Sequence, residues 1–314
     1  MRDRPITRGS LPARLLTLSL AVAVLGYAAI LVWFHFNEDA LLFHPRVAAP
    51  PGEPQGVGAT PADLPHHDVR FRGADGLTLV ARVIEPPPLP PAAPGASGPA
   101  PGWILYLHGS SGNVATPGYN QAWAEFHQLG LGVMAVDYRG YGDSAGVPSE
   151  AGLYLDAEAA YGYLTAELHV PPGRVIIYGY SLGSAVAIDL ASRLPAAGLI
   201  VEGAFLSIPA RGAELYPYLP VAWLAHNRFA SVDKVGRVTM PKLFIHASRD
   251  KVVPLAHGRR LFELARAPKY FQEVAGGHMD AYQVDPAFFG AVKTFAMGLG
   301  LPVVGAPAPA PTAR

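Results

Sequence analysis

The chain has 314 residues, half of them hydrophobic, and its 24 basic and 24 acidic residues give a formal net charge of zero. This length is sufficient for one large α/β domain with a substantial core. The balanced charge argues against nucleic acid as a partner. Because the chain has no cysteine, a cysteine nucleophile, disulfides and thiolate metal sites are excluded.

The first long apolar segment predicts a transmembrane helix. Residues 15–36 contain no Asp, Glu, Lys or Arg, and about 22 helical residues span about 33 Å, which matches a bilayer core. Residues 1–14 carry four arginines and one acid, whereas Glu38 and Asp39 follow the apolar segment. The positive-inside tendency therefore predicts a cytoplasmic N-terminus and a single-pass anchor, with the rest of the chain on the extracytoplasmic side of the membrane.

A cleaved signal peptide is the alternative interpretation of this segment. The apolar run is long for a signal peptide, and the best small-residue cleavage site, Val47-Ala48-Ala49, lies well beyond its end. We therefore expect an uncleaved anchor.

Three segments are expected to be irregular, and they flank or interrupt one domain over residues 67–300. Residues 37–66 are proline-rich and predict a linker. Residues 85–102 are rich in Pro, Ala and Gly and predict an exposed loop insertion, with a polyproline ligand for another protein as the alternative. Residues 301–314 form a low-complexity tail that we expect to be disordered.

Strand-like and helix-like runs then follow one another along the domain. Val69–Phe71 and Leu77–Ile84 predict two strands joined by a turn at Asp75-Gly76. The later strand-like runs are Trp103–Leu107, Gly132–Val136, Arg174–Tyr178, Gly198–Val201, Lys242–His246 and Tyr270–Val274; the helix-like runs are Gln121–Leu129, Ser149–Leu168, Ser181–Leu194, Leu255–Ala265 and Pro286–Leu299. This alternation predicts an α/β fold with a mostly parallel eight-stranded sheet and helices on both faces. Ligands of such sheets bind at the carboxyl ends of the strands.

The segment Gly179-Tyr180-Ser181-Leu182-Gly183 joins one of these strands to the next helix. Gly-x-Ser-x-Gly between a strand and a helix is typical of a nucleophile elbow, a tight turn that lifts a serine hydroxyl above the sheet. The N-terminus of the following helix favours negative charge that develops beside it. The motif alone is a weak signal in a glycine-rich chain, so its interpretation depends on the remaining catalytic groups.

A serine nucleophile needs a base, and four histidines follow Ser181. His278 follows the last strand and a pair of glycines, so we expect a loop that can carry its ring over the sheet. His246 lies inside a strand and predicts a core histidine, whereas His257 lies in the first turn of a helix and is expected at the surface. His226 lies in an irregular stretch. His278 is therefore the candidate base.

The base needs an acid to orient it, and Asp250 lies in the loop after the penultimate strand. There it would hold the imidazole tautomer whose second nitrogen faces the serine, and it would stabilise the imidazolium. Asp280 and Glu202 are the alternatives: Asp280 lies close to His278 in the sequence, and Glu202 follows a strand. An ordinary surface role for Asp250 also stays open.

Two backbone N–H groups must stabilise the oxyanion. Leu182 supplies one at the helix N-terminus, and Ser110, in the loop after Trp103–Leu107, is the candidate for the other, with Ser111 as the alternative. We expect His108 to brace this loop. The glycine-rich loop 137–144 lacks the ending of a phosphate-binding loop. We expect this loop either to line the pocket or to fix the connection from strand to helix, with Arg139 binding carbonyl groups.

Taken in order, these motifs resemble the α/β-hydrolase superfamily over about residues 38–299. They are most similar to a branch of membrane-anchored α/β-hydrolase-domain serine hydrolases related to prolyl-oligopeptidase-like domains. The resemblance implies a catalytic triad of Ser181, Asp250 and His278, oxyanion donors Leu182 and Ser110, and no metal or organic cofactor. Ala247 stands where the branch usually has glycine.

The resemblance implies action on acyl bonds, including thioesters. We therefore expect a membrane-anchored serine hydrolase of ester or thioester bonds, acting on a small acyl or lipidic substrate. The alternatives are a prolyl-oligopeptidase-like peptidase or amidase and a non-catalytic membrane-tethered binding protein. Residues 206–240 predict a small helical cap whose apolar side chains either line a pocket or pack on the domain.

Overall fold

The computed structural model describes residues 11–45, 64–88 and 100–304. Most of the predicted linker, the middle of the 85–102 loop and most of the 301–314 tail lie outside these residues. The domain is built on an eight-stranded sheet with the order β10-β9-β8-β7-β4-β6-β3-β2. In chain order its strands are β2 (His67–Arg72), β3 (Thr78–Ile84), β4 (Trp103–Leu107), β6 (Gly132–Asp137), β7 (Val175–Tyr180), β8 (Gly198–Glu202), β9 (Lys242–Ala247) and β10 (Lys269–Val274).

The pairing of the strands confirms the predicted mostly parallel sheet. Strands β4 and β6 to β10 pair in parallel, whereas β3 is antiparallel to both β2 and β6. Strands β4, β6, β7, β8 and β9 are buried along their whole length, as expected for central strands covered on both faces. The edge strand β2 instead exposes most of its side chains.

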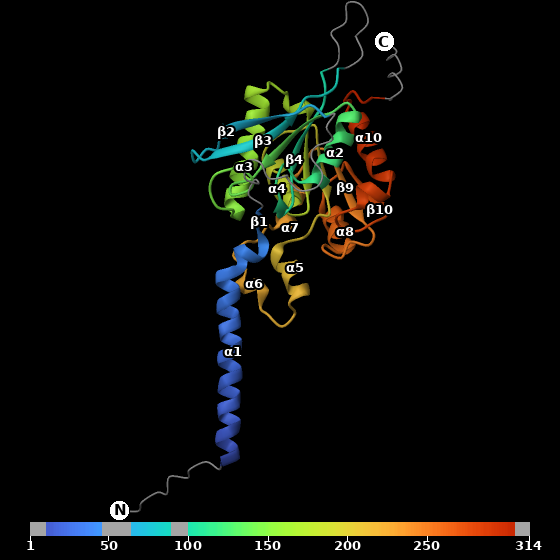
Figure 1. Cartoon of the computed structure of the whole chain (residues 1–314). Helices are drawn as coiled ribbons and strands as arrows, with labels where there is room; N and C mark the ends of the chain where they lie inside the picture. Colours follow the sequence, from blue (N-terminus) through green and yellow to red (C-terminus); the bar gives the residue numbers. More distant parts are fainter. Residues whose placement is uncertain (1–10, 46–63, 89–99, 305–314) are drawn as a thin grey trace, which may run out of the picture.

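Helices cover both faces of the sheet (Figure 1). The helices of the domain are α2 (Pro117–Gln128), α3 (Glu150–Gly162), α4 (Leu182–Ala191), α8 (Leu255–Leu264), α9 (Ala281–Val284) and α10 (Ala287–Gly298). Helices α3, α4 and α8 contribute to one buried apolar cluster, and α2 and α10 contribute to a second one across the sheet.

The predicted helices end earlier than the apolar pattern suggested. The run 149–168 divides into α3 and a π-helix at Tyr163–Glu167. Ser149 caps α3, because its side chain accepts a hydrogen bond from Gly152 N. Short 3₁₀ turns at Pro172–Arg174 and Val235–Arg237 lie in the connections.

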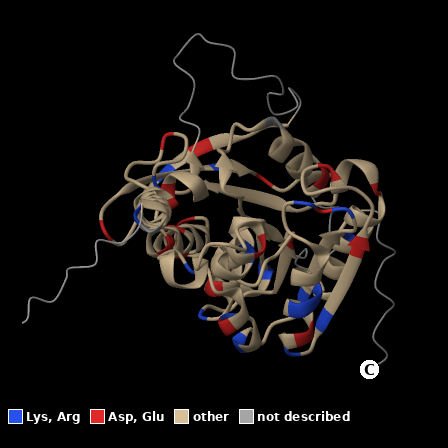
Figure 2. Ribbon diagram, turned by 90° about the horizontal axis from the view of Figure 1, so that it is seen from below, with Lys and Arg blue, Asp and Glu red and all other residues tan. Residues whose placement is uncertain are grey.

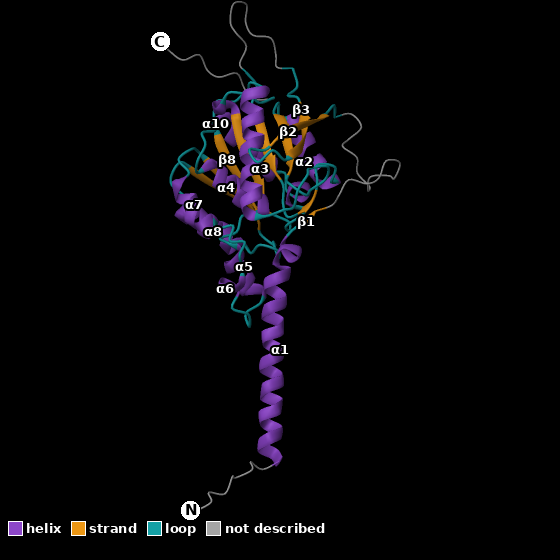
Figure 3. Ribbon diagram, turned by 90° about the vertical axis from the view of Figure 1, so that its left-hand side faces the viewer, coloured by secondary structure: helices purple, strands orange, loops and turns teal. Residues whose placement is uncertain are grey.

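Helix α1 (Leu11–Leu42) extends from the domain as a long rod (Figures 1 and 3). Among the described residues, its segment Arg14–Leu42 is the only helix long and apolar enough to cross a membrane. The helix extends past residue 36 into the segment predicted as an irregular linker. After Leu42 the chain forms β1 (His44–Pro45), which pairs in parallel with β5 (Ser111–Gly112).

A small cap lies beside the C-terminal half of α1, at the carboxyl ends of the sheet strands (Figure 1). It contains α5 (Ile208–Leu215), α6 (Val221–Leu224) and α7 (Ser231–Lys234). Basic and acidic residues are interspersed over the ribbon seen from this side (Figure 2). The cap and α1 both lie at the carboxyl ends of the strands, which is the edge of the sheet where ligands of this fold class bind.

Candidate active site

Ser181 occupies a strained turn between β7 and α4. Its backbone has φ 52° and ψ −118°, a left-handed conformation that is costly for a residue other than glycine. Its N–H donates to the Glu202 carbonyl oxygen at 2.9 Å, which ties the turn to β8. The strain presents the hydroxyl above the carboxyl end of the sheet.

The two glycines of the motif allow the turn to pack tightly. A Cβ atom at Gly183 would collide with the carbonyl oxygens of Leu107 and His108. A Cβ atom at Gly179 would collide with the Gly183 carbonyl and the Ala187 side chain. Larger residues would therefore push α4 away from β4, and Ser181 would move with it.

Ser181, His278 and Asp250 form a chain of hydrogen bonds. His278 Nε2 lies 2.9 Å from Ser181 Oγ, and His278 Nδ1 lies 2.7 Å from Asp250 Oδ2. With Nδ1–H donating to the carboxylate, Nε2 is left to accept the serine proton. The Asp250 side chain is almost completely buried and that of His278 nearly so. The arrangement can therefore move a proton from the serine to the imidazole.

The Asp250 carboxylate is oriented by the backbone of its own loop. Its Oδ1 accepts hydrogen bonds from Val252 N at 2.9 Å and Val253 N at 2.7 Å. Burial alone would raise the pKa of Asp250, but the hydrogen bond and charge of His278 and the Val253 N–H outweigh it and hold the pKa below its usual value. The acid therefore stays ionised beside the imidazole.

The alternative acids have other partners. Asp280 Oδ1 accepts from Gly277 N at 2.6 Å, so it shapes the loop that carries His278. Glu202 Oε2 accepts a short hydrogen bond of 2.5 Å from the Tyr178 hydroxyl. Burial raises the pKa of Glu202 to about 7, so much of this carboxyl is protonated near neutral pH.

His246 and His257 bond to groups other than the serine hydroxyl. His246 is buried, as expected, with Nε2 2.9 Å from the Val253 carbonyl oxygen. The expectation for His257 was wrong, because the ring is only 2% exposed. Its Nδ1 accepts from Leu206 N and its Nε2 bonds to Glu214, so the cap covers the start of α8.

The loop that carries the candidate oxyanion donors is fixed by the segment after α1. The Ser110 carbonyl accepts from His44 N at 2.8 Å and from the Tyr141 hydroxyl at 2.9 Å. His108 braces the same loop through a 2.8 Å contact between Nδ1 and the Gly109 carbonyl oxygen. Burial lowers the pKa of His108 to about 4, so its ring is neutral at pH 7. Leu182 opens α4, whose first N–H groups have no partners within the helix.

Arg139 fixes the connection from β6 to α3, as one alternative expected, but the carbonyl partners expected for it were wrong. Its guanidinium forms a bidentate pair with the buried Asp156 and a second ion pair, of 2.9 Å, with Asp75. Carboxylates rather than carbonyl groups therefore fix this arginine, and it joins α3 to the β2–β3 turn.

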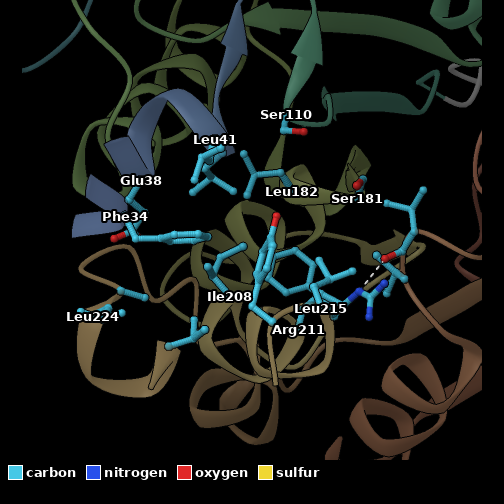
Figure 4. Close-up of a pocket in the computed structure, with 18 of the residues that line it drawn as sticks. Phe34, Glu38, Leu41, Ser110, Ser181, Leu182, Ile208, Arg211, Leu215 and Leu224 are labelled. Atoms are coloured by element: carbon cyan, nitrogen blue, oxygen red, sulfur yellow. Dashed lines mark hydrogen bonds between the residues drawn. The ribbon is translucent and has the colours of Figure 1, made fainter. Parts of the chain in front are cut away.

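An apolar cavity of about 280 Å³ opens at Ser181 (Figure 4). Ser110, Ser181 and Leu182 lie at one end of it. Helix α1 contributes one part of its wall with Phe34, Glu38, Leu41 and Leu42, and the cap contributes another with Ile208, Leu215, Tyr216, Val221 and Leu224. Of the two alternatives for the cap, pocket lining holds for Leu215, Tyr216 and Leu224, whereas Tyr218 and Trp223 are exposed and lie outside the cavity lining. The part played by α1 was not predicted.

A second cavity of about 370 Å³ reaches Ser181 and His278 from another side. Its lining includes the tyrosines at 106, 119, 180 and 282 together with Glu202. Ser181 thus lies where an apolar cavity and a tyrosine-lined cavity meet. In the described ranges 11–45, 64–88 and 100–304, no three His, Asp or Glu side chains are grouped as metal ligands.

Sequence reasoning missed Tyr180 as a supporting residue. Its hydroxyl donates to the His278 carbonyl oxygen at 2.9 Å, and its ring packs against the His278 ring with centroids 5.2 Å apart. The residue before the serine therefore holds the loop of the histidine. Its place in the motif was visible, but nothing local to it indicated a partner almost a hundred residues away.

Comparison with known proteins gives the family. Residues 98–233 match the family described as serine aminopeptidase, S33. The chain is 33% identical over 267 residues to the uncharacterized protein Rv2307c of Mycobacterium tuberculosis, covering 85% of this chain and 89% of that protein. It is 36% identical over 184 residues to lysophosphatidylserine lipase ABHD12 of Danio rerio, covering 53% of this chain but only 48% of that lipase.

Solved structures share the fold at low sequence identity. The esterase Pf2001 of Pyrococcus furiosus superposes with a TM-score of 0.62 and 18% identity, covering 82% of this chain and 98% of the esterase. This likeness confirms the predicted α/β-hydrolase fold.

Proposed function

Because the chain belongs to the α/β-hydrolase superfamily, within its esterase and lipase enzymes, we propose that it is a membrane-anchored serine hydrolase of acyl esters or thioesters. The observation that carries the proposal is the hydrogen-bond chain from Ser181 Oγ through His278 to Asp250. An acid, a base and a hydroxyl in this geometry form an activated nucleophile.

The proposed reaction proceeds through an acyl-enzyme. Ser181 Oγ attacks the acyl carbon while its proton passes to His278 Nε2, and the Leu182 and Ser110 N–H groups stabilise the oxyanion. The bond from the acyl carbon to the leaving oxygen or sulfur then breaks, and His278 returns the proton to the leaving group. Water, deprotonated by the same base, attacks the acyl-enzyme and releases the acid and Ser181. Asp250 stabilises the imidazolium in both halves of the reaction.

The two cavities support an assignment of the two parts of the substrate. The apolar cavity at Ser181 suits the acyl chain, and the tyrosine-lined cavity, which also reaches His278, suits the leaving group. The lipase among the relatives supports a lipid-like ester as the substrate class.

Aminopeptidase action is the second candidate, because the matching family model carries that description. Binding of a substrate ammonium group would favour an available carboxylate near the serine. In the described part of the two cavities, the carboxylates are Glu38 and Glu202. Glu38 accepts from the backbone N–H groups of His226 and Asn227, and the raised pKa of Glu202 weakens its charge at pH 7. Ester substrates are therefore favoured.

An alkyl fluorophosphonate is expected to label the full-length protein on Ser181, because the probe phosphonylates serines activated by a base. Mass spectrometry of the labelled peptide identifies the residue. In parallel, the hydrolysis of p-nitrophenyl esters of several chain lengths, an acyl thioester and an aminoacyl amide gives the substrate class. Labelling of another residue, or an amide hydrolysed faster than every ester, would contradict the proposal.

We propose further that α1 is an uncleaved, single-pass anchor with residues 1–14 in the cytoplasm and the catalytic domain on the other side. Contacts of α1 with the cap support retention of the helix: Phe34 packs on Tyr216 with centroids 5.0 Å apart, and the Tyr27 hydroxyl donates to the Tyr218 carbonyl oxygen at 2.8 Å. Removal of α1 would break both contacts.

The protein is accordingly expected to sediment with membranes and to resist extraction by alkaline carbonate, because about 30 Å of apolar helix holds it in the bilayer. Immunoblotting of the pellet and supernatant measures this, with a peripheral membrane protein as the extractable control. A shortened, soluble form in the supernatant would indicate cleavage and refute the anchor.

A further inference from the structure

Helix α1 forms one wall of the cavity that leads to Ser181. Phe34 and Leu41 face this cavity across from Ile208 and Leu215 of the cap, and Ser181 lies at its end (Figure 4). Phe34 also belongs to the charge-free segment 15–36. The cavity therefore extends from the serine to the part of α1 that the bilayer would surround.

Hydrogen bonds hold the cap against α1. The Glu38 carboxylate accepts from His226 N at 2.8 Å and from Asn227 N at 2.9 Å, and Asp39 Oδ1 accepts from the Asn227 side chain at 2.7 Å. Glu38 is buried. Buried charge-assisted hydrogen bonds of this kind fix geometry, so the wall supplied by α1 has a defined position relative to the serine.

The charged side chains that line this cavity form hydrogen bonds and ion pairs with other protein groups. Besides Glu38, the charged residue that lines it in the described chain is Arg211, whose guanidinium donates to the Val252 carbonyl at 2.7 Å and pairs with Glu214 at 2.8 Å. The remaining lining is mostly aliphatic and aromatic. A volume of about 280 Å³ is at the small end of ligand pockets, which favours one chain over two.

The tip of the cap has the composition of a membrane-contacting surface. Residues 215–225 contain no charged side chain, and Tyr218 and Trp223 are 88% and 90% exposed. Tyr218 lies beside Tyr27 of α1. Tyr27 is nine residues before the end of the charge-free segment, which corresponds to about 13 Å along the helix. This depth falls within the outer half of a hydrocarbon core about 30 Å thick, which an uncharged, apolar and aromatic tip suits.

We propose that the single acyl chain of a membrane-resident lipid ester enters this cavity from the bilayer and lies along α1, with its carbonyl carbon at Ser181. Phe34 and Leu41 then act as specificity-determining residues, and the transmembrane helix is part of the substrate site. The inference rests on the proposed hydrolase function. It goes beyond that function in assigning the route of entry and a wall of the chain-binding site to the anchor.

The first experiment changes the wall supplied by α1 in the full-length protein in detergent. Leu41→Trp is expected to lower the ratio of kcat/KM for p-nitrophenyl decanoate to that for the acetate by at least tenfold, because the indole fills space that a long chain needs. Hydrolysis of the acetate is expected to persist, which shows that the protein is folded. The matched control is Ala40→Trp, since Ala40 is exposed and outside the cavity lining. An unchanged ratio in Leu41→Trp would overturn the inference.

A binding measurement separates this inference from the proposed function. A decanoyl ester with a terminal diazirine is irradiated with the Ser181→Ala protein, and the crosslinked peptides are identified by mass spectrometry. Crosslinks to residues 34–42 and to the cap are expected whether or not the wild-type protein turns the ester over. Absence of ester hydrolysis with these crosslinks present would refute the function alone. Crosslinks elsewhere would overturn the inference.

A third measurement tests entry from the bilayer against entry from water. The double variant Tyr218→Asp/Trp223→Asp places two charges at the cap tip, so its insertion into lipid becomes costly. With protein reconstituted in phosphatidylcholine vesicles, hydrolysis of a long-chain ester dissolved in the same vesicles is expected to fall at least fivefold. Hydrolysis of water-soluble acetate ester is expected to stay within twofold. Equal hydrolysis of the vesicle-bound ester by both proteins would overturn the bilayer route.

Discussion

A Ser181→Ala variant is expected to lose ester hydrolysis by a factor on the order of 10⁴ to 10⁶, because a nucleophile that acts as a unit with its base contributes that much to kcat. The hydroxyl lies 2.9 Å from His278 Nε2, and alanine leaves nothing to attack the acyl carbon. The decisive measurement is kcat for a short p-nitrophenyl ester, compared with the background rate, together with loss of fluorophosphonate labelling.

Ser192→Ala is the matched control for this loss. Ser192 lies at the other end of α4, where its hydroxyl donates to the Asp189 carbonyl oxygen. The Ser192→Ala variant is expected to be as active as the wild type. Labelling that persists in Ser181→Ala would assign the nucleophile to another residue.

Asp250→Asn is expected to lower kcat by about 10⁴, the size of effect seen when a triad imidazole is held in the wrong tautomer. The reason lies in the donors around the carboxylate. Oδ1 receives the N–H groups of Val252 and Val253, so this position must remain an oxygen in asparagine. The amide NH₂ of the asparagine then faces His278 Nδ1 and donates a hydrogen bond to it. Because Nδ1 must accept this bond, the single proton of the neutral imidazole lies on Nε2. His278 Nε2 then donates toward Ser181 and can no longer take its proton.

The pH profile and two control variants test this explanation. Asp280→Asn and Glu202→Gln are expected to stay within about tenfold of the wild type, because Asp280 bonds to Gly277 N and Glu202 to Tyr178. Activity of Asp250→Asn is expected to rise at high pH, where the Nε2 proton is removed more readily. A larger loss in either control than in Asp250→Asn would transfer the orienting role to that residue.

The order of strands and helices was predictable because burial dominates this fold. Central parallel strands are covered on both faces, so runs such as Val175 to Ile177 are continuously apolar and stand out. The ends of the helices were less predictable, because each end depends on the backbone conformation of one or two residues. Helix α4 begins at Leu182 rather than Ser181 since the serine adopts a positive φ, and the π-helix after α3 has no compositional signal.

The candidate triad residues were identifiable because chain order and loop position limit the choices. The errors lay where long-range packing decides. His257 is buried by cap residues about 50 positions earlier in the chain. Arg139 forms an ion pair with Asp75, which lies in the distant β2–β3 turn. The contact of α1 with the cap joins residues almost 190 positions apart. A membrane span alone accounts for an apolar run of this length. The apolar pattern therefore gave no reason to expect that α1 also packs against the cap.

The short connection between α1 and the loop of Ser110 has a practical consequence for anyone who shortens this protein for expression. A soluble fragment that begins after Pro45 would lack Phe34 and Leu41, and it would also lack the β1 strand whose His44 N–H holds the Ser110 carbonyl. Its triad could be intact while its chain selectivity and oxyanion loop were altered. Kinetic constants measured on such a fragment are therefore expected to differ from those of the full-length chain, and substitutions at residues 34–42 of α1 are expected to change them too.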